Sequence, residues 1–163
     1  MLTTRPPHPD DAPALAALMT PGISRWLGHW PVPFTPAMAE ARIDAVLASG
    51  ARAEALTEVL LLDGQVAGWI GGAVQGSRAG FGYWLAEAAQ GRGLLRALAP
   101  GWVDRLGRAL QPQVLWASTQ PGNQGSRRVL AACGLRPVRQ GWMLTPARGR
   151  QEWVETWERA WPG

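Results

Sequence analysis

Lysine is absent from the sequence, so all sixteen basic residues are arginine, and the net charge is only +4. The arginines are scattered along the chain and form no clustered stripe of the kind that binds nucleic acid. Cysteine is nearly absent, and the single Cys133 excludes an internal disulfide framework. We therefore expect no nucleic-acid partner, and a small polyanionic ligand fits this charge better.

Long apolar runs are also missing. No stretch approaches the roughly 18 consecutive apolar residues that a membrane helix requires. The first residues, MLTTRPPHPDD, carry no apolar core of the kind found in a secretory signal. These absences predict no membrane partner and a cytoplasmic location. The length of 163 residues and the hydrophobic content of 47% fit one domain that spans residues 1–163.

The order of strand-like and helix-like segments predicts an α/β (α+β) domain with a central mixed, mostly antiparallel twisted sheet and about four flanking helices. Asp63-Gly64 stands between two apolar runs and favours a type I′ hairpin turn. Asp10 and Thr35 are expected to cap the first two helices. The expected strands are 1–5, 54–62, 65–74, 79–86, 113–119, 135–144 and 152–161, and the expected helices are 9–19, 36–50, 93–110 and 124–133.

Two of these segments contain residues that also favour a different conformation. Pro100-Gly101 should kink the third helix, because proline cannot donate a helical hydrogen bond. The final strand fits a helix equally well, because its tryptophans at 153, 157 and 161 repeat every fourth residue.

A glycine loop, Gln90-Gly91-Arg92-Gly93, joins a strand directly to a helix. Backbone N–H groups at a helix N-terminus, with no Cβ in the way, suit an anionic ligand. The loop lacks the lysine of a triphosphate-binding loop, and Arg96 stands where the dinucleotide fingerprint has its third glycine. On this loop alone, an anion site and a simple turn are equally supported.

A second motif, PGNQGSRRVLAACGLRPV, follows one strand later and combines with the loop into a recognisable pattern. Together the two stretches resemble the GNAT family of acyl-CoA-dependent N-acetyltransferases, whose signature Gln/Arg-x-x-Gly-x-Gly/Ala is matched by residues 90–95. The segments WLGHWPVPFTPAMAEARI and LLLDGQVAGWIGGAV are similar to the branch that contains the ribosomal-protein N-terminal acetyltransferases. The resemblance covers most of residues 1–142 and implies a GNAT-like fold.

The resemblance implies direct transfer of an acetyl group from acetyl-CoA to a primary amine, with no metal. The partners would be the small-molecule acyl-CoA and an amine acceptor, such as a protein or peptide N-terminus or a small amine. A homodimer is one oligomeric state that the family adopts. The implied cofactor-binding residues, from the pantetheine arm to the pyrophosphate, are Tyr83, Trp84, Leu85, Gln90, Gly91, Arg92, Gly93, Leu94, Leu95, Asn123 and Arg127. Arg92 or Arg96 would add charge at the pyrophosphate.

The chain departs from the family pattern where the leaving group is protonated. Leu130 stands where another branch has the tyrosine that protonates the thiolate. Ser126, three residues after Asn123, is the nearest hydroxyl on the same helix, and we predict it as the catalytic acid. The alternative, equally supported, is that Ser126 only bonds local backbone or a phosphate.

No general base can be assigned from the sequence, because the chain has no glutamate just before Gly82-Tyr83-Trp84. Glu58, Glu87, His8 and His29 remain as weak candidates. A site without a base favours an α-amine, which is neutral in about one molecule of seven at pH 7, against about one of 2,500 for a lysine ε-amine.

The acceptor cleft and the activity itself leave alternatives open. Trp26, Trp30 and Trp142 could line a cleft for the acceptor or simply fill the core. A CoA-sensing or interaction module without turnover would have the same fold. A dinucleotide-binding oxidoreductase rests only on Gly91 and Gly93. Cys133 is expected to be a buried hydrophobe and not a nucleophile.

Overall fold

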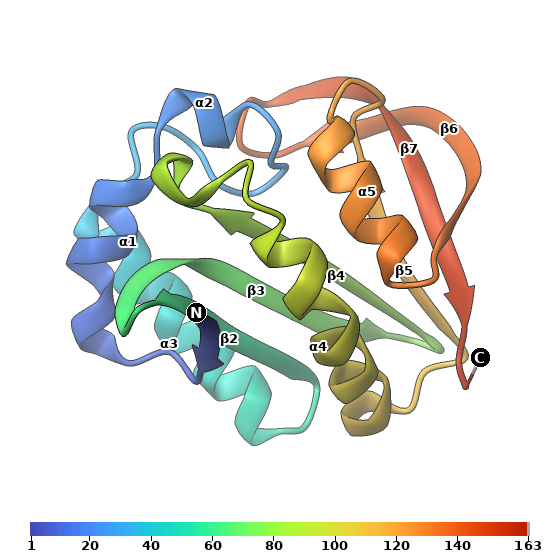
Figure 1. Cartoon of the computed structure of the whole chain (residues 1–163), viewed down its shortest axis with the longest axis horizontal. Helices are drawn as coiled ribbons and strands as arrows, with labels where there is room; N and C mark the ends of the chain where they lie inside the picture. Colours follow the sequence, from blue (N-terminus) through green and yellow to red (C-terminus); the bar gives the residue numbers. More distant parts are fainter. Residues whose placement is uncertain (163) are drawn as a thin grey trace.

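A single seven-stranded sheet forms the centre of the protein, whose computed structural model describes residues 1–162 (Figure 1). The strand order is β1-β2-β3-β4-β5-β7-β6. All neighbours are antiparallel except β4 and β5, which are parallel, so the predicted mixed and mostly antiparallel sheet is confirmed. The strands are β1 (Leu2–Arg5), β2 (Ala55–Leu62), β3 (Gln65–Gln75), β4 (Arg78–Leu85), β5 (Val114–Thr119), β6 (Arg136–Thr145) and β7 (Arg150–Ala160).

Five helices flank the sheet, one more than the sequence indicated. Helices α4 and α5 lie on one face, and α1 and α3 lie on the other (Figure 1). The additional helix, α2, is a single turn within the proline-rich connection and is too short to show a hydrophobic period. The helices are α1 (Ala12–Leu18), α2 (Pro21–Ser24), α3 (Pro36–Ala51), α4 (Leu94–Leu110) and α5 (Gln124–Ala132), with 3-10 turns η1 (Pro9–Asp11) and η2 (Glu87–Ala89).

One of the two predicted N-terminal helix caps is present in the structure and the other is not. Thr35 Oγ1 accepts a hydrogen bond from the Met38 N–H at 3.2 Å, as predicted for the start of α3. The expected cap at Asp10 is wrong, because a 3-10 turn precedes α1 and His8 caps that turn. The His8 ring accepts from the Asp10 N–H at 3.2 Å, and the carboxylate of Asp11 accepts from the His8 N–H at 2.8 Å.

The hairpin and the final strand pair are confirmed. Asp63 and Gly64 have φ values of 51° and 84°, which is the left-handed conformation that a type I′ turn needs at both positions. Strand β7 lies between β5 and β6, so two rows of backbone hydrogen bonds favour the strand over the helix. Helix α4 runs from Leu94 to Leu110 through Pro100 as one element.

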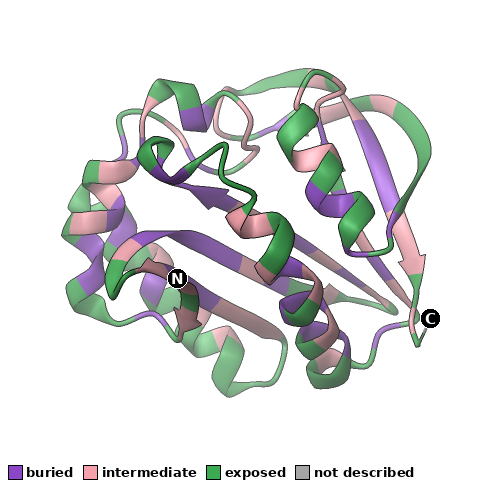
Figure 2. Ribbon diagram, in the orientation of Figure 1, coloured by how far each residue is buried: buried purple, intermediate pink, exposed green. Residues whose placement is uncertain are grey.

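The two faces of the sheet bury separate apolar cores. One core packs α4 and α5 against Leu60, Ile70 and Leu115, and the other packs α1 and α3 against Val59 and Trp69. Figure 2 shows buried residues concentrated on the central strands and exposed residues along β6 at the sheet edge. The centre of the sheet is therefore packed on both faces.

Candidate active site

Strands β4 and β5 separate near the middle of the sheet and open a cleft. They pair only at Arg78–Gly80 and Val114–Trp116, although β4 continues to Leu85 and β5 to Thr119. The cleft has a volume of about 1080 Å³, and residues from both faces of the sheet line it. Beyond the separation, the edges of β4 and β5 that face each other share no hydrogen bonds. Free strand edges can pair with an extended ligand, much as they would with an added strand.

The glycine loop lies at one end of this cleft and exposes backbone N–H groups. Gly91 and Gly93 have φ values of 75° and 73°, where a side chain is strained. The Ala97 N–H donates to Gly93 O at 3.1 Å, so the N–H groups of residues 94–96 have no acceptor within the helix. A Cβ added at either glycine would meet no atom within 4 Å. The loop therefore offers donors and open space to an anion at a helix N-terminus.

Arginines add positive charge to the cleft at one position that the sequence indicated, Arg96, and at one that it did not, Arg128. Arg96 and Arg128 line the cleft. Arg92 and Arg127 are not among the lining residues, and Arg127 Nε lies 3.1 Å from the carboxylate of Glu155 on β7. The cofactor contacts predicted for Arg92 and Arg127 stay predictions.

The remaining predicted cofactor contacts gather in the cleft. Gln90 bonds inward, since its Nε2 donates to Leu85 O at 2.8 Å and ties the loop to the end of β4. The Trp84 ring belongs to the core under α1 and α3, so its main chain would make the ligand contact. The cleft is lined by Tyr83, Trp84, Leu85, Gln90, Gly91, Gly93, Leu94, Leu95, Asn123 and Ser126.

Two hydroxyl groups meet in the cleft at the start of α5. Asn123 Oδ1 accepts from the Ser126 N–H at 3.1 Å, which confirms Asn123 as the helix cap. Ser126 Oγ lies 2.9 Å from the hydroxyl oxygen of Tyr83, the only tyrosine in the chain. Burial raises the pKa of the Tyr83 phenol above its ordinary value, so this group stays protonated at neutral pH. Sequence reasoning missed this contact because the two residues are 43 positions apart.

An aromatic cluster forms the wall of the cleft on the opposite face of the sheet. The ring of Trp30 lies 5.3 Å from that of Trp69 and 5.2 Å from that of Trp84. Arg42 stacks over Trp30 at 4.1 Å and donates to the carbonyl of His29. Its guanidinium forms no ion pair with a carboxylate within residues 1–162, so it gives this wall a free positive charge.

Of the three tryptophans considered for an acceptor cleft, two line this cleft, and Trp142 lines a second, smaller cavity beside it. Trp26 and Trp30 are lining residues. Trp142 lies on edge strand β6 with 69% of its surface exposed, and its ring meets Trp153 edge-on at 5.4 Å.

The turn between β6 and β7 closes the far side of the cleft through one arginine. Arg148 donates to the carbonyls of Ser24 at 2.7 Å and Leu27 at 2.9 Å. It also pairs with Glu152 at 2.6 Å. Hydrogen bonds from Arg148 lower the pKa of Glu152 to about 2. Arg148, together with the Ala147 N–H that donates to Gly28 O at 2.9 Å, therefore fixes the β6–β7 turn, residues 146–149, against the end of α2 and the segment that follows it.

Only one of the four candidate bases lines the cleft, and that is His29. Partial burial, followed by a neighbouring guanidinium, lowers the pKa of His29, so its imidazole is neutral at pH 7. Glu58 is bound under α4 by Arg105 at 2.6 Å. Glu87 accepts a hydrogen bond from the α1–α2 connection, and His8 caps η1. Glu152 also lines the cleft, but a carboxylate whose pKa is about 2 is a very weak base.

Cys133 follows α5 with 2% of its surface exposed, and it is absent from the cleft lining. Burial raises the pKa of its thiol to about 12, so the thiolate is not populated at neutral pH. This fits the expectation of a buried hydrophobe.

Comparisons with known proteins agree with this geometry. A family model described as an acetyltransferase (GNAT) domain matches residues 1–136. A search of curated proteins found no match. Among solved structures, Mycobacterium smegmatis RimJ in complex with CoA-disulfide has a TM-score of 0.85 at 22% identity, over 99% of this chain and 82% of that one.

Two further structures show the same fold. The ribosomal-protein-S5-alanine acetyltransferase from Vibrio fischeri has a TM-score of 0.81 at 19% identity, over 98% of this chain and 92% of that one. The microcin C7 self-immunity acetyltransferase MccE, in complex with acetyl-CoA and AMP, has a TM-score of 0.82 at 15% identity, over 98% and 92% of the two chains.

Two features are absent from residues 1–162. No helix in this range is long and apolar enough to cross a membrane. No group of three or more histidine, cysteine, aspartate or glutamate side chains in it could hold a metal ion.

Proposed function

The chain belongs to the GNAT acetyltransferase family, and on that premise we propose that it moves an acetyl group directly from acetyl-CoA to the α-amine of a peptide or protein N-terminus. A family model that covers residues 1–136 makes it an acyl-CoA-dependent acetyltransferase. Family membership does not specify the acceptor, so the α-amine is our proposal. A small amine that is equally weakly basic remains within this proposal. We also keep the cytoplasmic location and the homodimer as proposals.

Acetyl-CoA would bind on the face of the sheet that carries α4 and α5, from the glycine loop at the start of α4 to the start of α5. The pyrophosphate would accept hydrogen bonds from the N–H groups of residues 91–95, with Arg96 and Arg128 supplying charge. The pantetheine arm would pair with the free edge of β4 at residues 83–85. The thioester would then lie beside the Tyr83 and Ser126 hydroxyls.

The reaction needs one proton to leave the amine and one to reach the sulfur. A neutral amine attacks the thioester carbonyl, the C–N bond forms, and the C–S bond breaks as the tetrahedral intermediate collapses. The hydroxyl of Ser126 donates a proton to the departing thiolate, the phenol of Tyr83 resupplies Ser126 across 2.9 Å, and water returns a proton to Tyr83. The proton from the nitrogen leaves to water or to His29.

The charges around the cleft explain why an α-amine suits this site. The single carboxylate that lines it, Glu152, is paired with Arg148 and cannot act as a base near neutral pH. A lysine side chain would need a base to lose its proton, whereas an α-amine is already neutral in about one molecule of seven at pH 7.

The observation that carries the proposal is the separation of β4 from β5 beside the Tyr83–Ser126 pair. The test is a thiol-release assay with acetyl-CoA and a panel of peptides, polyamines and amino acids. We expect turnover with peptides that have a free α-amine and none with the same peptides blocked at that amine. Millimolar acetyl-CoA should also raise the melting temperature, because a ligand that binds only the folded state stabilises it.

The result separates the proposal from its alternative. Protection by acetyl-CoA without thiol release for any amine would indicate a CoA-binding module, an outcome that the lack of a strong base in the cleft would then explain. No protection by any short acyl-CoA would contradict both functions.

A further inference from the structure

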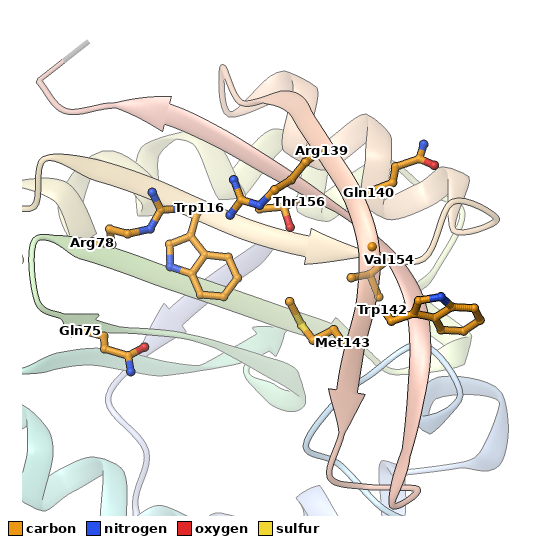
Figure 3. A pocket seen from close by; sticks show the side chains of 10 residues that line it. Gln75, Arg78, Trp116, Arg139, Gln140, Trp142, Met143, Val154 and Thr156 are labelled. Atoms are coloured by element: carbon orange, nitrogen blue, oxygen red, sulfur yellow. The ribbon is translucent and has the colours of Figure 1, made fainter.

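The cleft continues along the sheet into a second cavity of about 480 Å³ (Figure 3). Four lining residues belong to both, namely Gln75, Trp116, Met143 and Val154. The second cavity is lined from β5, β6 and β7 on the face that carries α1 and α3 (Figure 3). None of the helices within residues 1–162 covers these three strands on that face (Figure 1). The two cavities therefore form one groove that leads away from the separation of β4 and β5.

Glycines on β4 leave space in this groove because they carry no side chain. Gly82 on β4 has open space at its Cβ position. The Trp116 ring packs directly on Gly80, since a Cβ at position 80 would lie only 2.8 Å from the indole. The groove therefore has room for an extended main chain, with the Trp116 ring beside its path.

Two arginines at the far end of the groove share one carboxylate. Arg78 and Arg139 both donate to the same oxygen of Glu158, at 2.5 Å and 2.9 Å. Hydrogen bonds from Arg78 and then Arg139 lower the pKa of Glu158, so this carboxylate stays ionised. Two guanidinium groups carry ten N–H donors between them, and one carboxylate leaves a net positive charge and most of the donors available. Figure 3 shows both arginine side chains next to Trp116.

The wall nearer the reaction site is also suited to a peptide. Arg42 adds a second cationic group with no carboxylate partner within residues 1–162. The buried indole N–H of Trp84, another lining residue, has no acceptor within the same residues. A peptide carbonyl would supply one.

We propose that the groove binds the acceptor as an extended peptide and that Arg78 and Arg139 form a subsite for an acidic side chain downstream of the acetylated N-terminus. This inference rests on the proposed function, because it places the amine beside Tyr83. Tyr83 and Arg78 are five positions apart on β4, which is about 17 Å at the rise of a strand. An extended peptide covers that distance in about five residues, so the acidic residue is expected near position five.

The test compares two peptides that differ by one charge. Ser-Ala-Ala-Ala-Glu-Ala and Ser-Ala-Ala-Ala-Gln-Ala, both amidated at the C-terminus, are assayed for kcat/KM by thiol release with the full chain. We expect the Glu peptide to be preferred about fivefold, a value typical of a solvent-accessible charge-assisted contact. The preference should shrink in 0.5 M salt, because salt screens exposed charges.

Variants then assign the preference to the subsite. Arg139→Gln should reduce the ratio of the two kcat/KM values to near one, and so should Arg78→Gln. Arg108→Gln is the matched control, because Arg108 is exposed near the end of α4 and lines neither cavity. It changes the net charge by the same amount and should keep the ratio at about five. Protection by acetyl-CoA against thermal unfolding establishes that each variant is folded.

The assay distinguishes failure of the acidic subsite from failure of the proposed function. Turnover of both peptides at equal rates would overturn the acidic subsite and leave the proposed function standing. A preference that survives in Arg139→Gln and Arg78→Gln, or that disappears in Arg108→Gln, would also overturn it. No turnover of any peptide would overturn this inference, and no turnover of small α-amines in the same assay would contradict the proposed function itself.

Discussion

Replacing Arg148 by methionine tests how much this side chain contributes to fixing the β6–β7 turn, which the backbone bond from Ala147 to Gly28 also holds. The substitution removes an ion pair with Glu152 and two hydrogen bonds to the carbonyls of Ser24 and Leu27. Both partners of the ion pair are mostly buried, with side chains 20% and 15% exposed. Methionine keeps much of the apolar stem, so the loss concerns the charged contacts.

The size of the effect follows from the pKa of Glu152. A fall in the pKa of Glu152 from 4.5 to about 2 corresponds to at most about 3–4 kcal/mol of stability, of which Arg148 supplies the largest share and Thr145 and Arg150 supply less. Solvent reaches the pair, so we expect about 2 kcal/mol, which lowers the melting temperature of a chain of this length by about 4–8 °C.

The pH dependence has a definite sign. Glu152 has a lower pKa in the folded chain than in the unfolded chain, so its contribution is fully present above about pH 4.5 and is lost as the pH falls toward 2. The difference between wild type and Arg148→Met should therefore shrink by about half between pH 7 and pH 3. Melting temperatures measured at both values check this.

Arg150→Met is the matched control for charge and position. Arg150 bonds the same Glu152 at 3.2 Å but is 67% exposed, so its loss should cost under about 0.5 kcal/mol. In the activity assay, Arg148→Met should raise the KM for the peptide and leave acetyl-CoA protection unchanged. Equal melting temperatures for the two variants, or an unchanged peptide KM in Arg148→Met, would refute the role of Arg148.

Four further predictions concern the site. Ser126→Ala should lower turnover at least about tenfold with acetyl-CoA affinity nearly unchanged; lost affinity with normal turnover would make Ser126 a binding residue. Tyr83→Phe should reduce kcat by about 2- to 10-fold in the wild type and have no further effect in Ser126→Ala, which a double-mutant cycle measures. Gly93→Ala should weaken both CoA and acetyl-CoA in a calorimetric titration, whereas Gly76→Ala, with a similar positive φ and equally open space, should not. The fall of kcat/KM at low pH should follow the pKa of the acceptor amine, so peptides of different α-amine pKa should give different pH profiles. A profile that is the same for all peptides would indicate a base on the enzyme, and His29 would be the first residue to replace.

Local signals in the sequence predicted most of the fold. Asp63-Gly64 specified its turn, Thr35 and Asn123 their helix starts, and alternating apolar residues the strands, because each of these depends on neighbours within a few positions. The first helix start was wrong because His8 and Asp11 form a reciprocal cap that competes with Asp10.

The site was less accessible to sequence reasoning. The glycine loop could be found because its residues are consecutive. The contact of Tyr83 with Ser126 depends on how α5 packs beside β4, and the shared bonds of Arg78 and Arg139 to Glu158 depend on which strands become neighbours. Sequence spacing carries no signal for such pairs, and scattered arginines look like surface charge until the sheet brings them together.

The burial of Cys133 affects how the activity can be measured. A thiol-detecting reagent added to the native chain should find no reactive sulfur, because this side chain is 2% exposed and its pKa is about 12. Every thiol detected during turnover would therefore come from released CoA, and only denaturant should reveal one equivalent per chain. The same burial leaves oxidised CoA with no partner for disulfide exchange on the folded enzyme. A CoA-disulfide would then act on this chain only as a reversible competitor of acetyl-CoA.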